Sequence, residues 1–181
     1  MGLLSKLLGR GRADMKDAAR IYTLVMAQSR LPEFYGEERF PDNYDGRIDV
    51  LTLNLCVIMN RLRDFGRNGE LLSQAIFDTL RDDFEIALRE EGLSDKGVAK
   101  RIKPMIRLVF DRLKTYDAMI NAEDIDDEAL SNAVAKSLGA QTHTPFTDDV
   151  ANYGSLFFKN LKTLSLGEIA MAKFAFPKLN A

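Results

Sequence analysis

The sequence is poor in the side chains that most catalytic and metal sites require. It has one histidine, His143, one cysteine, Cys56, and no tryptophan among its 181 residues. Zinc and haem sites draw on several histidine or cysteine ligands, so the sequence offers no material for one. It also has no glycine-rich phosphate loop, no Gly-x-Ser-x-Gly turn and no Cys-x-x-Cys pair. We therefore expect no metal, no cofactor and no enzymatic activity, and we interpret His143 as a surface loop residue.

A single cysteine excludes a disulfide bond within the chain. Cys56 lies in the apolar run from Val50 to Met59, where its simplest role is that of a small core residue. The cysteine content fits a reducing compartment. We expect a cytoplasmic protein, peripheral to the inner membrane, or a matrix protein if the source is eukaryotic.

Neither a strong positive charge nor a long hydrophobic run is present. The net charge of -2 and the pI near 5.5 argue against a dedicated nucleic-acid binder, so we expect no specific DNA partner. The apolar run from Val50 to Met59 is bounded by Asp49 and Arg61. It is too short to cross a bilayer, which requires about 20 apolar residues. The sequence thus excludes an integral membrane protein.

Apolar residues recur every three to four positions along most of the chain, which predicts helices rather than strands. We expect an all-α, single-domain bundle of about six to seven helices. We predict that Asp45 caps the central helix, that Asn68-Gly69 interrupts the chain, that Gly92 ends a helix, and that Pro104 bends the next one near Lys100. The other expected helices are Asp14 to Arg30, Glu70 to Glu91, one starting at Ser94, one ending near Gly139, Asp148 to Leu164 and Leu166 to Phe174.

Four acidic residues, Asp78, Asp82, Asp83 and Glu85, form the most enzyme-like group in the sequence. Helical prenyl-transfer enzymes hold magnesium-bound diphosphate with carboxylates one turn apart, but the position four after Asp82 is Ile86. The simpler interpretation is an exposed helical face supported by the pairing of Glu85 with Arg89. That face could also dock a partner.

Basic side chains follow one another along the helix that starts at Ser94. They are Lys96, Lys100, Arg101, Lys103, Arg107 and Lys114. They could meet anionic lipid, ribosomal RNA or an acidic patch of a partner, or they could form an ordinary solvated face. The sequence does not separate these alternatives.

The N-terminal residues have the pattern of a short interfacial helix. We predict membrane contact by Leu3, Leu4, Lys6, Leu7, Leu8 and Arg10, with further positive charge from Arg12 and Lys16. Residues 1–13 would then form a basic amphipathic segment, and residues 14–181 a helical domain. The alternative is an end that frays or packs on the protein itself.

The loop from Tyr35 to Asp49 is long for a compact domain and is a candidate for specific recognition. The competing interpretation is structural. In that case Arg47 pairs with Asp49 or Asp42 and fixes the loop, with Gly46 allowing the turn.

Two clusters, Asp45-Gly46-Arg47-Ile48-Asp49 and Leu88-Arg89-Glu90-Glu91-Gly92, carry a resemblance to a known family. Between about Tyr22 and Tyr116 the sequence resembles the ubiquinol-cytochrome c chaperone family. The resemblance implies a helical, non-enzymatic assembly factor of the cytochrome bc1 complex. It further implies binding to newly made cytochrome b or a related hydrophobic subunit, near the ribosome in mitochondrial members.

On these grounds we predict one set of partner-binding residues. The set is Tyr35, Asp42, Arg47, Asp49, Asp82, Arg89, Lys100 and Lys103. The alternative functions are a small helical protein or enzyme that binds lipid or isoprenoid, and a ribosome-associated factor that uses the residues from Lys96 to Lys114.

Overall fold

The computed structural model describes residues 3–120, 124–140 and 142–179, with side chains from Met15 onward. The described residues form α-helices and no strand, so the predicted all-α fold is confirmed. The elements are α1 (Leu3–Gln28), a 3-10 turn η1 (Pro32–Phe34), α2 (Tyr44–Arg63), α3 (Gly66–Glu90), α4 (Asp95–Asp117), α5 (Asp127–Ser137), α6 (Pro145–Lys162) and α7 (Leu166–Ala170).

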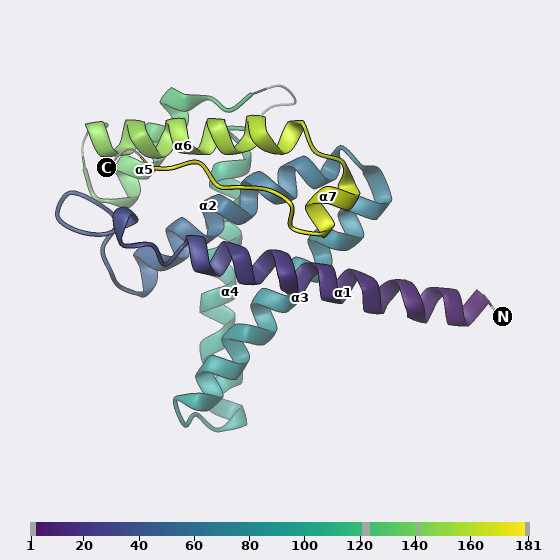
Figure 1. Cartoon of the computed structure of the whole chain (residues 1–181). Coiled ribbons are helices and arrows are strands. Elements are labelled where there is room, and N and C mark those ends of the chain that lie inside the picture. The colour runs from purple at the N-terminus through teal and green to yellow at the C-terminus, as the bar shows by residue number, and fades with distance from the viewer. Residues whose placement is uncertain (1–2, 121–123, 141, 180–181) are drawn as a thin grey trace.

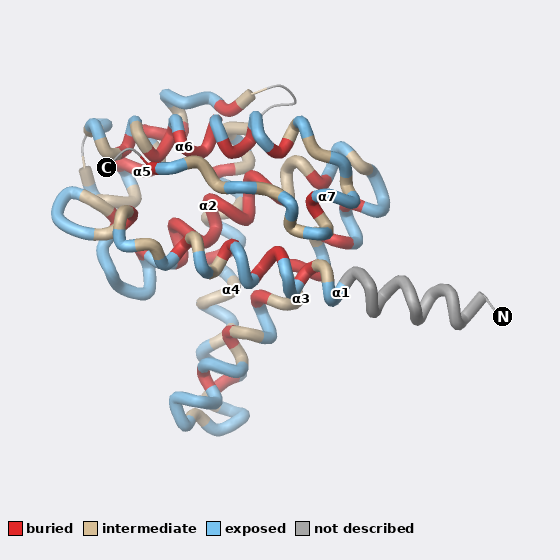
Figure 2. Tube along the Cα trace, in the orientation of Figure 1, coloured by how far each residue is buried: buried red, intermediate tan, exposed pale blue. Residues whose placement is uncertain are grey.

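Helix α2 is the centre of the bundle. Its residues from Ile48 to Ile58 are all buried, as the apolar run predicts for a helix that is covered on every side. Helices α1, α3, α4 and α6 pack around it (Figures 1 and 2). Arg61 near its end donates from Nε to the Leu161 carbonyl at 3.1 Å and from Nη2 to the Leu164 carbonyl at 2.8 Å. These bonds tie α2 to the end of α6.

Helices α3 and α4 form an antiparallel hairpin that projects from the rest of the molecule (Figure 1). We call this hairpin the α3–α4 arm. Gly92, at φ +84°, follows α3 as predicted, and the Ser94 side chain accepts from the Gly97 N–H to start α4. The end of the arm is largely exposed, whereas its base contacts α2 (Figure 2). The arm therefore holds apolar side chains outside the main core.

The C-terminal residues differ from the predicted helix over Leu166 to Phe174. The capping box of Ser165 and Glu168 is confirmed, but α7 ends at Ala170, and an extended segment then runs between α6 and α1 (Figure 1). Phe174 and Phe176 pack on Phe157 with ring centroids 5.9 and 4.7 Å away. Exposure alternates from Met171 to Phe176, which is the period of an extended chain rather than a helix.

Several predicted boundaries move for local reasons. Asn43, rather than Asp45, caps α2, because its side chain accepts from the Gly46 N–H at 3.1 Å. Helix α6 begins at Pro145 behind a capping box of Thr144 and Thr147. Helix α4 continues without interruption through Pro104, and the bend near Lys100 remains a prediction.

Gly69 has a different role from the predicted chain break. It lies inside α3, where the backbone passes close to the end of α2. A Cβ atom at this position would lie 1.7 Å from the Leu62 carbonyl oxygen and 2.7 Å from its carbon. Glycine is therefore required for the α2–α3 contact, since no other residue lacks this atom.

We expect Gly69→Ala to lower the free energy of unfolding by about 2 kcal/mol or more, because the backbone of α2 or α3 must move. Gly167→Ala is the matched control, since a Cβ atom there would meet no other atom within 4 Å and helices favour alanine. Urea denaturation followed by circular dichroism measures both. Equal midpoints for the two variants would contradict the assigned role of Gly69.

Candidate functional site

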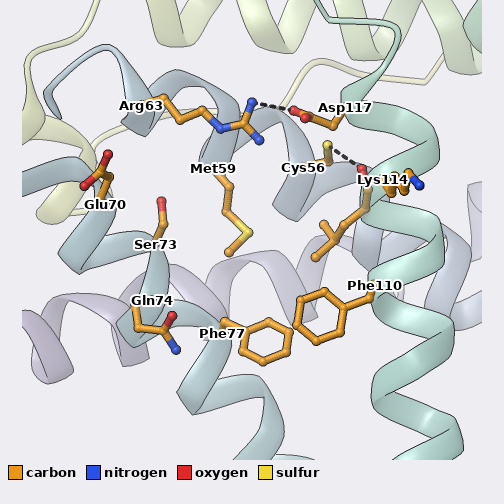
Figure 3. A pocket seen from close by; sticks show the side chains of 11 residues that line it. Cys56, Met59, Arg63, Glu70, Ser73, Gln74, Phe77, Phe110, Lys114 and Asp117 are labelled. Carbon is orange, nitrogen blue, oxygen red and sulfur yellow. Dashed lines mark hydrogen bonds and ion pairs between the residues drawn. The ribbon is translucent and has the colours of Figure 1, made fainter. Parts of the chain in front are cut away.

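Two adjoining cavities run along the α3–α4 arm and meet at Phe77. We call them together the α3–α4 groove. The first has a volume of about 520 Å³ and is lined from α2, α3 and α4 by Cys56, Met59, Arg63, Glu70, Ser73, Gln74, Phe77, Phe110, Leu113, Lys114 and Asp117 (Figure 3). The second has a volume of about 670 Å³ and lies farther along the arm.

The floor of the first cavity is apolar. Met59 points into it from α2, and the rings of Phe77 and Phe110 face each other across α3 and α4 with centroids 4.7 Å apart (Figure 3). Phe110 is 53% exposed, which is a large fraction for a phenylalanine in a folded helical bundle. An aromatic ring at the mouth of an apolar cavity is a typical contact residue for a hydrophobic ligand or peptide.

The rim of the first cavity is polar. Arg63 Nη1 lies 2.9 Å from Asp117 Oδ1, which also accepts from Asn60 Nδ2 at 3.0 Å. Ser73 Oγ is buried and has no hydrogen-bond partner among the described residues. An apolar floor, a charged rim and one available hydroxyl suit an amphipathic occupant.

The second cavity repeats this pattern. Its floor is formed by Phe77, Val98, Ala99, Ile102 and Ile106. A chain of ion pairs borders it. Arg81 pairs with Glu85 at 3.2 Å, Glu85 with Arg89 at 3.3 Å, and Arg89 with Asp95 at 3.9 Å. The predicted pairing of Glu85 with Arg89 is thus confirmed.

The structure divides the predicted partner-binding residues between two regions. Arg89 and Lys103 line the second cavity, and Asp82 and Lys100 are exposed on the same arm. Tyr35, Asp42, Arg47 and Asp49 do not line the groove. The predicted set thus includes residues of the arm but none from the floor of the groove, and their role in binding stays a prediction.

The loop before α2 is held by contacts with the residues that flank it, Ser29 after α1 and Arg47 in the first turn of α2. Arg47 Nε pairs with Asp42 Oδ1 at 2.8 Å, on the exposed side of the loop. The Tyr35 hydroxyl donates to the Ser29 carbonyl, and burial raises the pKa of Tyr35 to about 12. This is the predicted pairing of Arg47 with Asp42, whereas Asp49 has other partners.

Asp49 is buried between α2 and α4, with 2% of its surface exposed. Its Oδ1 pairs with Nε of Arg112 and accepts a hydrogen bond from the Tyr116 hydroxyl at 3.5 Å. Burial raises the pKa of Asp49, while Arg112 and Tyr116 act in the opposite direction. We interpret Asp49 as a link between two helices, since its side chain does not reach the surface.

Two of the acidic residues on α3 hydrogen-bond to other side chains of the protein. Asp83 accepts from the Tyr22 hydroxyl of α1 at 2.9 Å, and Asp78 accepts from Gln74 at 2.9 Å. Among the residues that the structure describes, no cluster of three potential metal ligands is present. His143 is exposed in a linker, with Nδ1 at 3.0 Å from Asp148 Oδ1.

The N-terminal prediction lies outside the described side chains. Leu3, Leu4, Lys6, Leu7, Leu8 and Arg10 belong to the part of α1 for which only the helix is described. In the described part of the chain, no helix is long and apolar enough to span a bilayer.

Phe77, Phe110 and Met59 are the groove residues that sequence reasoning missed. The sequence does hold a signal for Phe110, because this aromatic residue interrupts the basic stripe of α4 instead of joining its apolar face. Met59 and Phe77 follow the apolar periodicity of their helices and look like core residues. Only the three-dimensional arrangement reveals that they face an open cavity.

The arrangement is that of a helical binding protein with an open, apolar groove. The model of the ubiquinol-cytochrome c chaperone family matches residues 37–176, and the chain belongs to this family, as the two sequence clusters predict. Its fold is similar to the crystal structure of the Cbp3 homolog from Brucella abortus. The TM-score is 0.77 at 24% identity, covering 99% of this chain and 98% of that chain. No curated protein matches the chain. Family membership supports a chaperone role in bc1 assembly and an interaction with a subunit of that complex.

The reactivity of the single cysteine can be used to test the packing beneath the first cavity. Cys56 is 3% exposed, its Sγ donates to the Leu113 carbonyl at 3.5 Å, and burial raises its pKa. The thiolate is the reactive form, and each unit of pKa lowers its fraction about tenfold. We expect a disulfide reagent to modify Cys56 at least about tenfold more slowly in the native protein than in urea. Equal rates would contradict the described packing of α2 against α4.

We expect Asp49→Ala to lower the free energy of unfolding by about 3 kcal/mol, because it leaves Arg112 without its partner inside the fold. Asp42→Ala is the control, because it removes an acidic residue from an exposed ion pair. Its denaturation midpoint should barely change. A double-mutant cycle of Asp49 and Arg112 measures the coupling, and additive losses would contradict a direct pair.

Proposed function

We propose that this protein is a non-enzymatic chaperone that binds newly made cytochrome b during assembly of the bc1 complex, using the α3–α4 groove. Membership of the ubiquinol-cytochrome c chaperone family supports a role in assembly of the bc1 complex. The observation that supports the site is the contact between the half-buried Phe77 and the exposed Phe110 in an apolar cavity on the arm.

The groove suits a hydrophobic segment that has not yet been inserted or assembled. Its floor offers aromatic, methionine and branched side chains, which adapt to many apolar sequences. Its borders carry charges that are already paired, such as Arg63 with Asp117 and Glu85 with Arg89. The charged side chains at the borders are hydrated and keep empty grooves of different molecules from associating with each other. The apolar floor supplies the contact area for the client.

The loop residues and the N-terminal segment have secondary places in this proposal. Tyr35, Asp42 and Arg47 present a second, polar surface for a bc1 subunit. Leu3, Leu4, Lys6, Leu7, Leu8 and Arg10 place the protein at the inner membrane as a peripheral protein, in the cytoplasm or, in a eukaryotic source, in the matrix. Ribosome association would bring the groove to the client during synthesis.

We expect Phe110→Ser to reduce the capture of newly made cytochrome b by about tenfold, because an exposed aromatic anchor typically contributes more than 1 kcal/mol. Phe110→Leu should retain most of the capture. Leu156→Ser is the matched control, since Leu156 is 42% exposed on α6 and does not line the groove. Affinity purification of the tagged protein after pulse labelling measures all three.

Two results would contradict the proposal. One is a wild-type protein that captures no bc1 subunit. The other is unchanged capture by Phe110→Ser while the amount of assembled bc1 complex also stays normal. Thermal denaturation of each variant separates loss of binding from loss of folding.

The second candidate function is binding of a lipid or isoprenoid. The cavity of about 520 Å³ has the size of a small-molecule site, and Ser73 Oγ lacks a partner among the described residues. Native mass spectrometry of protein purified from its source tests this alternative. A stoichiometric lipid that Phe110→Ser loses would favour it over the chaperone proposal.

A further inference from the structure

The outer face of α4 carries five basic side chains and one phenylalanine. Each residue of an α-helix is rotated by about 100° about the helix axis from the one before it. On this basis the six side chains fall within an arc of about 80° around α4, and this arc contains no acidic residue. The set is Lys96, Lys100, Lys103, Arg107, Phe110 and Lys114, and we call it the basic face. At 1.5 Å per residue it extends for about 27 Å along the arm.

The basic face points away from the protein. The residues on the opposite side of α4, such as Val98, Val109 and Tyr116, are buried, whereas all six residues of the basic face are exposed. The groove lies along one edge of the basic face, because Lys103, Phe110 and Lys114 also line its cavities.

The charges of the basic face are not neutralised within the described structure. None of its five cations takes part in an ion pair among the described residues, while Arg63, Arg81 and Arg89 beside the same groove are all paired. Of the carboxylates at its edges, Asp117 is engaged by Arg63, and Asp111 contributes one negative charge. In a protein of net charge -2, this is a local concentration of positive charge.

We propose that the basic face of α4 docks on an anionic lipid bilayer. Each basic side chain near such a surface contributes about 1 kcal/mol, so five of them on one face of a helix hold the arm against the lipid headgroups. Phe110, in the same row, can insert its ring at the level of the headgroups.

A bilayer fits these observations better than a nucleic acid does. The phosphate-lined surface of a nucleic-acid duplex offers a phenylalanine ring no partner, whereas the interface of a bilayer favours the ring. The overall negative charge opposes a polyanion that wraps around the molecule. A lipid bilayer is flat, so it contacts only the basic face and not the negatively charged rest of the protein.

Docking in this orientation places the edge of the groove at the membrane surface, because Lys103, Phe110 and Lys114 belong to both. A hydrophobic segment could then pass between groove and bilayer without crossing water. This consequence rests on the proposed function, whereas the docking itself does not.

The test is sedimentation of the full-length protein with vesicles of phosphatidylcholine, with and without added phosphatidylglycerol. We expect binding only to the anionic vesicles and release by high salt. The variant Lys96→Gln, Lys100→Gln, Arg107→Gln removes three charges from the basic face and leaves every groove residue in place. It should weaken vesicle binding by at least about tenfold.

The matched control is Lys136→Gln, Lys173→Gln, Lys178→Gln, which removes three exposed charges elsewhere and has the same net charge. It should bind as the wild type does.

Binding by the first variant equal to that of the wild type overturns the inference and assigns membrane contact to another part, such as residues 1–13. Wild-type protein that binds an RNA oligonucleotide but no anionic vesicle overturns it in favour of nucleic acid. Capture of cytochrome b from detergent extract by the wild-type protein, with no vesicles present, tests the groove separately.

Discussion

The buried carboxylate of Asp49 and the guanidinium of Arg112 hold the functional part of this molecule in position. Asp49 belongs to the fully covered α2, and Arg112 belongs to α4 near the base of the arm. Tyr116, one turn farther along α4, hydrogen-bonds to the same carboxylate. If α4 moved relative to α2, the buried carboxylate would be left without its partner, which is costly. This contact therefore fixes the position of α4 against α2 more specifically than apolar packing alone would.

The shape of the arm and its groove follow from that attachment. Helix α3 is held close to α2 by the absence of a side chain at Gly69, and α4 is held by Arg112. Between these two fixed bases lie Met59, Phe77 and Phe110, which face an open cavity instead of a fourth helix. The fold therefore has two parts: α1, α2 and α6 bury the core, and the arm leaves apolar surface open in the groove.

Patterns within single elements predicted much of the fold, because they depend on neighbours in the sequence. The buried run of α2, the cap at Ser94, the Gly92 end of α3 and the capping box of Ser165 and Glu168 are all of this kind. The partner of Asp49 is 63 positions away, and nothing in a single sequence connects them. The period-two alternation after Met171 is short, and the preceding capping box favours a longer helix. The groove itself was beyond prediction, since its floor residues have the same spacing as core residues.

In the chaperone proposed here, the groove for the client and the basic face for the membrane share an edge. Phe110 belongs to both, with half of its surface exposed beside the cations of the basic face. Three arginines on the groove's borders, Arg63, Arg81 and Arg89, are neutralised by internal pairs, whereas the cations of the basic face form no ion pair among the described residues. This contrast distinguishes a surface for apolar contact from one for anionic contact.

The most direct measurement is site-specific photocrosslinking in cells that synthesise the bc1 complex. A photoreactive phenylalanine analogue would replace Phe110 in the groove in one strain and Tyr44, which is also exposed, near the loop in another. The account predicts a crosslink from position 110 to newly made cytochrome b, and a weaker one or none from position 44. A crosslink to cytochrome b from position 44 alone would contradict it and place the client at the loop before α2.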